Sequence, residues 1–186
     1  MKEGYLSVII VTAIVSVFIA RQVSENRHEE REINFPCSGA EYYSTLDFIR
    51  AVGIEENQDN EIAKKMSKSK ALENLNSKIL ITIISIISNN DEIMKENLET
   101  EFKKIFIEEK KLITKTIIIN HLTICEKFTK THGLYKCYIT VEIDCDKVLK
   151  PIYKKLLDLN VFGINYNYAD FKKTCTGTIQ RNESNI

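Results

Sequence analysis

The stretch Leu134–Asp144 reads LYKCYITVEID, and apolar residues alternate with other residues along it. A period of two places every second side chain on the same face of a β-strand. The face that this alternation assigns to the protein core carries Tyr135, Cys137, Ile139, Val141 and Ile143. The stretch is therefore predicted to be a strand with one buried face.

A second strand is predicted just before it, because Thr114–Phe128 contains the run TIIINHLTICEKF. The residues Thr129–Gly133 separate the two stretches, and a short loop that ends in glycine is typical of a β-hairpin. The simplest register for this hairpin pairs Phe128 with Leu134.

A third strand and a long helix are predicted upstream of the hairpin. Asp47–Ile54 (DFIRAVGI) alternates apolar and polar residues, and Asp59 is a plausible helix N-cap. After Asp59, mostly apolar residues recur every three or four positions, which predicts an amphipathic helix with one buried stripe. The stripe consists of Ile62, Met66, Ser69, Leu72, Leu75, Ile79, Ile83 and Ile86. The β-branched stretch Leu80–Ile87 favours a strand by propensity, but the stripe continues in phase through it, so we expect it to be helical.

The remaining elements are predicted from shorter patterns. They are a helix at about Glu96–Leu112, a helix at Asp146–Leu159 that Pro151 either kinks or begins, an extended segment from Phe162 to Tyr168, and a helical turn at Ala169–Thr174. Asp144 or Asp146 is expected to cap the start of the second of these helices. The predicted fold class is α+β, with an antiparallel sheet packed against a long amphipathic helix and preceded by an N-terminal hydrophobic helix.

The N-terminal stretch Gly4–Ala20 contains no charged residue and is almost wholly apolar from Tyr5 onward. Its length lies between that of a secretory signal core and that of a membrane-spanning helix. Three interpretations remain open: a retained signal anchor, a cleaved signal peptide, or a buried core helix. The predicted organisation is a signal anchor or signal peptide at 1–20, a polar linker at 21–34, one α+β domain at 35–180 and a disordered tail at 181–186.

The charge balance bears on the class of partner. The chain has 26 basic and 26 acidic residues, and these are mixed along the sequence. Nucleic-acid-binding domains usually carry a basic patch. We therefore expect no nucleic-acid partner.

Several motifs together are similar to those of the LPP-twenty lipoprotein-like family, especially its members from the Bacteroides group of bacteria. They are Phe35–Cys37, Tyr42–Tyr43, Ile49–Gly53, Asp59–Lys65, Ala71–Leu75, Lys78–Ile79, Ile124–Lys127 and Tyr135–Glu142. The resemblance covers roughly residues 35–175 and implies a small α+β domain displayed in the bacterial cell envelope, with no established catalytic residues. One departure is that Cys37 follows Asn34-Phe35-Pro36 and a charged stretch, so lipidation of Cys37 is not expected.

The chain has 5 cysteines, and no two of them show the spacing of a zinc or redox motif. The predicted hairpin register places Cys125 opposite Cys137, close to the separation that a disulfide needs. Two expectations remain open: a Cys125–Cys137 disulfide in an oxidising compartment, or two small buried thiols.

Four tyrosines are a candidate interaction surface, namely Tyr42, Tyr43, Tyr166 and Tyr168. Tyrosine is enriched at protein interfaces. The alternative is that these side chains belong to a sheet face that the helix covers.

No known catalytic, phosphate-binding or metal-binding motif is present, so no catalytic, cofactor-binding or metal-binding residue is predicted. On a strand, His121 and Cys125 would be about 13 Å apart, too far for a nucleophilic pair. We expect a non-enzymatic protein of the bacterial cell envelope, membrane-anchored through residues 5–20 or periplasmic, that binds an envelope protein or itself. The alternatives are a carrier of a small apolar ligand between helix and sheet and, last, a thiol-dependent enzyme.

Overall fold

The structure is a computed structural model, and it describes residues 35–88, 110–158 and 167–184. The chain divides into two units, Met1–Asn34 and Phe35–Ile186, and the described residues all belong to the second. That unit combines an antiparallel sheet with helices, which confirms the predicted α+β class. The predicted hydrophobic N-terminal helix and the polar linker lie outside the described residues. Among the helices that the structure describes, none has the length and apolar character needed to cross a membrane.

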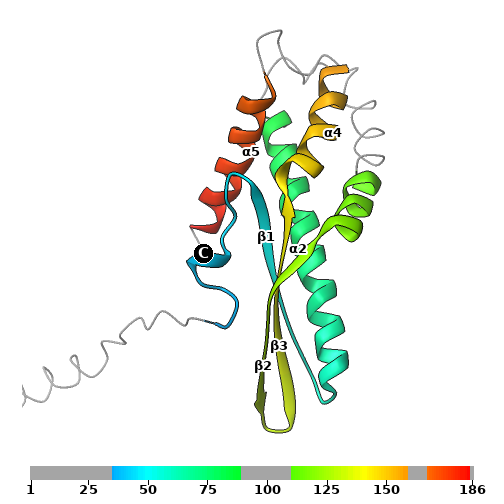
Figure 1. Cartoon of the computed structure of the whole chain (residues 1–186), viewed down its shortest axis with the longest axis vertical. Coiled ribbons are helices and arrows are strands. Elements are labelled where there is room, and N and C mark those ends of the chain that lie inside the picture. Colours follow the sequence, from blue (N-terminus) through cyan, green and yellow to red (C-terminus); the bar gives the residue numbers. More distant parts are fainter. Residues whose placement is uncertain (1–34, 89–109, 159–166, 185–186) are drawn as a thin grey trace, which may run out of the picture. The chain divides into compact units, whose positions relative to one another are not determined.

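The sheet has three strands in the order β1-β3-β2 (Figure 1). They are β1 (Phe48–Asn57), β2 (Leu122–Thr131) and β3 (Leu134–Asp144), and β3 pairs antiparallel with both neighbours. The strands predicted at 47–54 and 134–144 are thus confirmed. The predicted core face of β3 is also confirmed, because Cys137, Ile139, Val141 and Ile143 are all buried.

Helix α2 (Asn60–Ser88) packs against β1 and β3. Its first turn is capped as predicted, because Asp59 Oδ1 accepts hydrogen bonds from the backbone N–H of Glu61 (2.8 Å) and Ile62 (3.0 Å). The β-branched stretch Leu80–Ile87 is helical, as the phase of the apolar stripe predicted. Burial of that stripe in the core therefore outweighs the strand propensity of its residues.

The first half of the predicted stripe is wrong by one position. Ile62 and Met66 are 46% and 41% exposed, whereas the small residues Ala63, Ser67 and Ala71 are buried. The reason lies in β1, where a Cβ atom on Gly53 would stand 2.1 Å from the carbonyl oxygen of Ser67 and 2.3 Å from the amide nitrogen of Ala71. The helix approaches the strand so closely that only small side chains fit between them.

The predicted hairpin loop is also wrong, because only His132 and Gly133 connect the two strands. Both have positive φ, 50° and 82°, as a two-residue hairpin turn of type I′ requires. Phe128 consequently pairs with Cys137 and not with Leu134. The sequence offered a weak signal here, since histidine is less common than asparagine or glycine at such a position.

The strand predicted from Thr114 begins only at Leu122, because residues 110–120 are helical. Ile113 and Ile117 are spaced by one helical turn and are both buried in the core. Their burial on one helix face outweighs the strand propensity of a run of isoleucines. Residues 96–109 of the predicted second helix lie outside the described ranges.

Two helices follow β3. Helix α4 (Cys145–Asp158) contains Pro151, and the Asp144 carboxylate accepts a 2.7 Å hydrogen bond from the backbone N–H of Asp146, which confirms the predicted cap. Helix α5 (Tyr168–Glu183) is longer than the predicted turn at 169–174. Tyr168, predicted to be extended, begins this helix; residues 162–166 lie outside the described ranges.

The predicted disordered tail is wrong for residues 181–183, which belong to α5. The Glu183 carboxylate accepts hydrogen bonds from the backbone and hydroxyl of Ser44, 2.9 and 2.8 Å long, and forms an ion pair with Lys78 of α2. The Glu183 side chain is 11% exposed, so a partly buried polar contact holds the end of this helix. A pattern of apolar residues could not reveal such an anchor.

Candidate functional site

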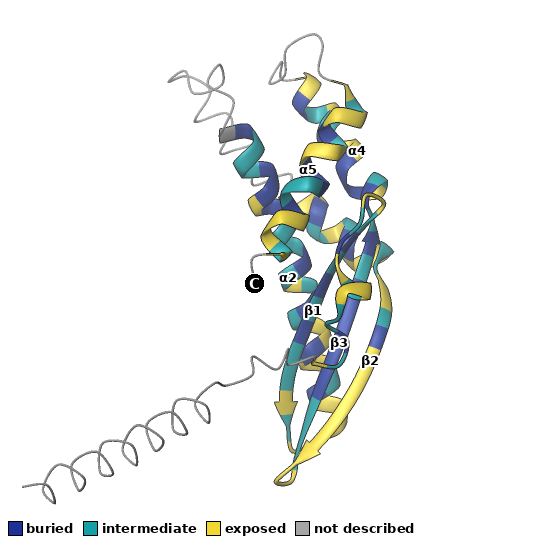
Figure 2. Cartoon of the chain, turned by 90° about the vertical axis from the view of Figure 1, so that its left-hand side faces the viewer, coloured by how far each residue is buried: buried dark blue, intermediate teal, exposed yellow. Residues whose placement is uncertain are grey.

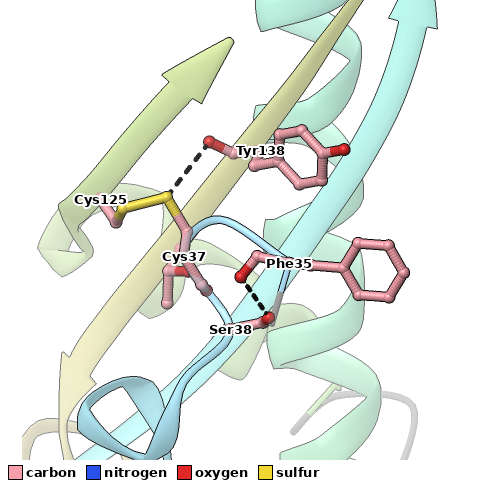
Figure 3. The surroundings of a disulfide bond; sticks show 6 residues. Phe35, Cys37, Ser38, Cys125 and Tyr138 are labelled. Carbon is pink, nitrogen blue, oxygen red and sulfur yellow. Dashed lines mark hydrogen bonds between the residues drawn. A yellow bond between two sulfur atoms is a disulfide. The ribbon is translucent and has the colours of Figure 1, made fainter. Parts of the chain in front are cut away.

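A segment of residues 35–47, called here the outer segment, lies on the sheet face opposite α2. It includes the short 3-10 helix η1 (Ala40–Tyr42). A disulfide joins Cys37 of this segment to Cys125 of β2 (Figure 3). The hydroxyl of Thr140 donates a 2.6 Å hydrogen bond to the carbonyl oxygen of Cys37, and the Phe35 ring lies over Tyr138 of β3. The outer segment is thus fixed covalently to the edge strand and by hydrogen bonds to the central strand.

The predicted Cys125–Cys137 disulfide is wrong. In the observed register Cys125 pairs with Thr140, and Cys137 pairs with Phe128. Residues 125 and 128 are an odd number of positions apart, so Cys125 and Cys137 lie on opposite faces of the sheet. Cys37 and Cys125 are 88 residues apart in the sequence, so no local pattern indicates that they pair.

The three free cysteines, Cys137, Cys145 and Cys175, are buried. Burial raises the pKa of Cys145 to about 12 and the pKa of Cys175 to about 12, and burial also raises the pKa of Cys137. A protonated thiol is a poor nucleophile. These side chains fill the core and are not suited to nucleophilic catalysis at neutral pH.

The prediction that His121 lies in a strand is wrong, because His121 directly follows the helical stretch 110–120 and β2 begins at Leu122. Its backbone N–H donates to the carbonyl oxygen of Ile117, and its Nδ1 lies 2.9 Å from the same oxygen. The imidazole of His121 therefore contacts the last carbonyl groups of the helix. Cys125 is in a disulfide and has no free thiol that could form a nucleophilic pair with His121.

The candidate tyrosine surface is not brought together in the described residues. Tyr42 and Tyr43 precede Ser44, which contacts Glu183 at the end of α5. Tyr168 begins α5, about 22 Å away along the helix axis at 1.5 Å per residue. Tyr166 lies outside the described residues.

A network of ion pairs surrounds Asp146 at the start of α4. Its carboxylate oxygens lie 2.9 Å from Lys150 Nζ and 3.0 Å from Lys172 Nζ, and Oδ1 accepts a 2.8 Å hydrogen bond from the Tyr168 hydroxyl. These hydrogen bonds hold the pKa of Asp146 well below its ordinary value. Lys172 also pairs with Asp47 ahead of β1. The network joins α4, α5 and the start of the sheet, and each of its charges has a partner, as in a structural contact.

Replacing Asp146 with asparagine is expected to lower the free energy of unfolding by about 1 kcal/mol at neutral pH, a small value because the site is partly exposed. The depressed pKa means that this contribution is present above the unfolded-state pKa of about 4 and is lost as the pH falls below it. Urea unfolding of both proteins at several pH values tests this, and their stabilities should converge in acid. Asp158→Asn, at the exposed end of α4, is the control and should change stability by less than about 0.5 kcal/mol. A difference that persists in acid would contradict the assignment.

The first half of the free edge of β1, from Phe48 to Val52, is covered by hydrogen bonds from other segments. Thr45 bonds to both the N–H and the carbonyl of Phe48, and the N–H of Arg50 donates to the Ser44 hydroxyl. From α2, Lys78 Nζ donates to the carbonyl of Arg50, and the Asn74 side-chain amide donates to the carbonyl of Val52. The outer segment and α2 together occupy backbone groups of Phe48, Arg50 and Val52 that would otherwise be free to pair with another strand.

The free edge of β2 differs from that of β1. In the described part of the chain, no segment donates or accepts a hydrogen bond there. Every side chain from Glu126 to Thr131 is exposed, and Figure 2 shows β2 as the exposed strand of the sheet. An uncovered strand edge is a template for pairing with another extended chain. This edge is the candidate functional site.

The residues of this site were not singled out from the sequence. The sequence did contain a weak signal for an exposed strand. Glu126–Thr131 has no large aliphatic residue on either face. Apart from Phe128, both faces of this half of β2 therefore carry only charged residues and threonines. Which edge of the sheet is open depends on side chains from the outer segment and α2.

The space between helix and sheet, expected in the carrier alternative to hold a ligand, is filled where α2 crosses β1. Gly53 there lies in direct contact with the backbone of Ser67 and Ala71. A ligand does not fit at this point.

The chain matches no protein-family model, no curated protein and no solved structure.

Proposed function

We propose that this chain is a non-enzymatic interaction protein of the cell envelope. In this proposal residues 5–20 hold it at a membrane, and the open edge of β2 pairs with an extended strand of a protein partner. The single observation that supports it best is the difference between the two sheet edges. From Phe48 to Val52 the edge of β1 is covered by Ser44, Thr45, Asn74 and Lys78, while no described residue covers the edge of β2.

Two observations support a location outside the cytosol. The Cys37–Cys125 disulfide belongs to the kind of bond that persists in oxidising compartments and is rare in the cytosol. The uncharged apolar stretch Gly4–Ala20 is suited to insertion in a membrane. The resemblance to the LPP-twenty lipoprotein-like family agrees with both and suggests a bacterial envelope.

The physical basis of the proposed binding is main-chain hydrogen bonding. A strand added to β2 would satisfy the outward N–H and carbonyl groups of several residues at once, and the side chains of β2 would select the partner. Each such bond contributes little by itself. Tethering to a membrane raises the local concentration of both partners, so a modest intrinsic affinity would suffice.

A photoreactive phenylalanine analogue placed at Phe128 of the full chain, in intact cells, tests the proposal. We expect light-dependent cross-links to protein at Phe128, because the edge of β2 is open, and none at Phe48, the matched control on the covered edge of β1. The cross-linked chain should be recovered with the membrane fraction. Equal cross-linking at both positions, or at neither, would contradict edge pairing, and recovery of the intact chain in the cytosol would contradict anchoring.

A further inference from the structure

We infer that the strand that pairs with β2 is β2 of a second copy of this chain, antiparallel and centred on Phe128. In this arrangement Phe128 faces Phe128 of the second copy, and Glu126 of each copy faces Lys130 of the other. The inference rests on the proposed function and names its partner. It follows from the backbone direction along β2 and from the order of charges on it.

The backbone groups at the free edge belong to the even-numbered residues of β2. In β1 the groups of Phe48, Arg50 and Val52 point away from β3, so the odd-numbered residues of β1 bond to β3. Their partners in β3 are odd-numbered as well, which leaves the even-numbered groups of β3 for β2. The even-numbered residues of β3 pair with Cys125, Lys127, Thr129 and Thr131 of β2, so these residues of β2 bond to β3. The N–H and carbonyl groups of Glu126, Phe128 and Lys130 therefore point outward.

A two-fold axis perpendicular to the sheet would extend it without exchanging its faces. Each residue then faces a residue on the same face of the second copy, and outward-pointing groups must meet outward-pointing groups. Only registers centred on a residue of β2 satisfy this condition. Several such registers exist, and the charges on β2 distinguish them.

A register centred on Glu126 places that carboxylate opposite its own copy, and one centred on Lys127 does the same for an ammonium group. Like charges directly opposite one another destabilise a strand pair. A register centred on Thr129 places Lys130 opposite Phe128 and pairs no charges. The register centred on Phe128 alone places two opposite-charge pairs across the interface, Glu126 with Lys130 at either end.

The surroundings of the three residues leave room for this pairing. Helix α2 packs on β1 and β3, while Glu126, Phe128 and Lys130 are all exposed. Phe128 is 40% exposed, and pairing would bury it against a second aromatic ring. Glu126 already forms a 2.8 Å ion pair with Lys64, whereas Lys130 lies over the neutral ring of Tyr135. Charge reversal at Lys130 therefore disturbs the isolated chain less than charge reversal at Glu126.

Charge reversal in the full chain, solubilised in detergent, tests the inference by sedimentation. Lys130→Glu is expected to raise the dimer dissociation constant about tenfold, because two repulsive pairs replace two attractive ones. Glu126→Lys should do the same. An equimolar mixture of the two variants should form a mixed dimer of near-normal affinity, since both of its cross-strand pairs are then complementary. Lys127→Glu is the control, since residue 127 faces Thr129 in this register and should have little effect.

The register is tested with single added cysteines. Under mild oxidation Phe128→Cys should give a disulfide-linked dimer, because residue 128 meets itself on the axis, and Lys127→Cys should not. Variants that leave a stable dimer unchanged, or a wild-type chain that is a monomer at every concentration, would overturn the inference. If photo-cross-linking at Phe128 instead captures a protein of different mass, edge pairing stands and self-pairing is wrong. If nothing is captured there, both fail.

Discussion

Replacing Gly53 with alanine is expected to lower the free energy of unfolding by about 3 kcal/mol or more, a large part of the stability of an ordinary domain. The added methyl group would lie 2.1 Å from the carbonyl oxygen of Ser67 and 2.3 Å from the amide nitrogen of Ala71. Both are backbone atoms of α2, so no side-chain rotation relieves the contact. The helix would have to move away from β1 and open the core that Ala63, Ala71 and Leu75 form against the sheet.

Urea unfolding of the full chain, followed by circular dichroism or by tyrosine fluorescence, measures this change; the absence of tryptophan makes the tyrosine signal usable. The matched control is Gly177→Ala in α5, where a methyl group meets nothing within 4 Å. That variant should gain about 0.5–1 kcal/mol, the helix-propensity difference between alanine and glycine. If Gly53→Ala is as stable as Gly177→Ala, the close contact between helix and strand is wrong.

Loss of the Cys37–Cys125 disulfide is expected to have an effect of similar size. Cys125→Ser should lower the free energy of unfolding by about 2–4 kcal/mol, because the bond closes a loop between residues 88 positions apart and so restricts the unfolded chain. The outer segment would also lose its covalent link to β2. The hydrogen bond between Thr140 and Cys37 would then hold it more weakly against the sheet.

The control for this prediction is a thermodynamic cycle. Cys37→Ser, Cys125→Ser and the double variant should have nearly the same stability, since each removes the same bond. A reductant should lower the stability of the wild-type chain to that level and leave the double variant unchanged. Additive effects of the two substitutions, or a wild-type stability that does not respond to reductant, would show that the two cysteines are not paired.

The local patterns of the sequence predicted the elements that depend on near neighbours in the chain. The alternation in Leu134–Asp144 identified a strand and its buried face, and Asp59 marked the start of α2. The helical phase also identified the conformation of Leu80–Ile87 against its propensity. The run of isoleucines before Leu122 was the exception, because its residue types favour a strand whereas the spacing of Ile113 and Ile117 is helical.

The candidate site could not be predicted in this way, because it depends on contacts between distant segments. β1 and β2 have 10 residues each, and the polar composition of Glu126–Thr131 does not by itself determine which strand has the open edge. The first half of the β1 edge is covered because Ser44, Asn74 and Lys78 reach it from the outer segment and from α2. The disulfide likewise joins residues that only the fold places on the same face.

The periodicity of side chains thus determined the fold class, the direction in which β3 faces and the helical conformation of Leu80–Ile87, because it reflects backbone geometry over a few residues. Tertiary packing decided the close approach at Gly53, the partner of Cys125 and the bare edge of β2. Each of these depends on which parts of the chain meet in space. Spacing along the sequence contains no measure of that distance.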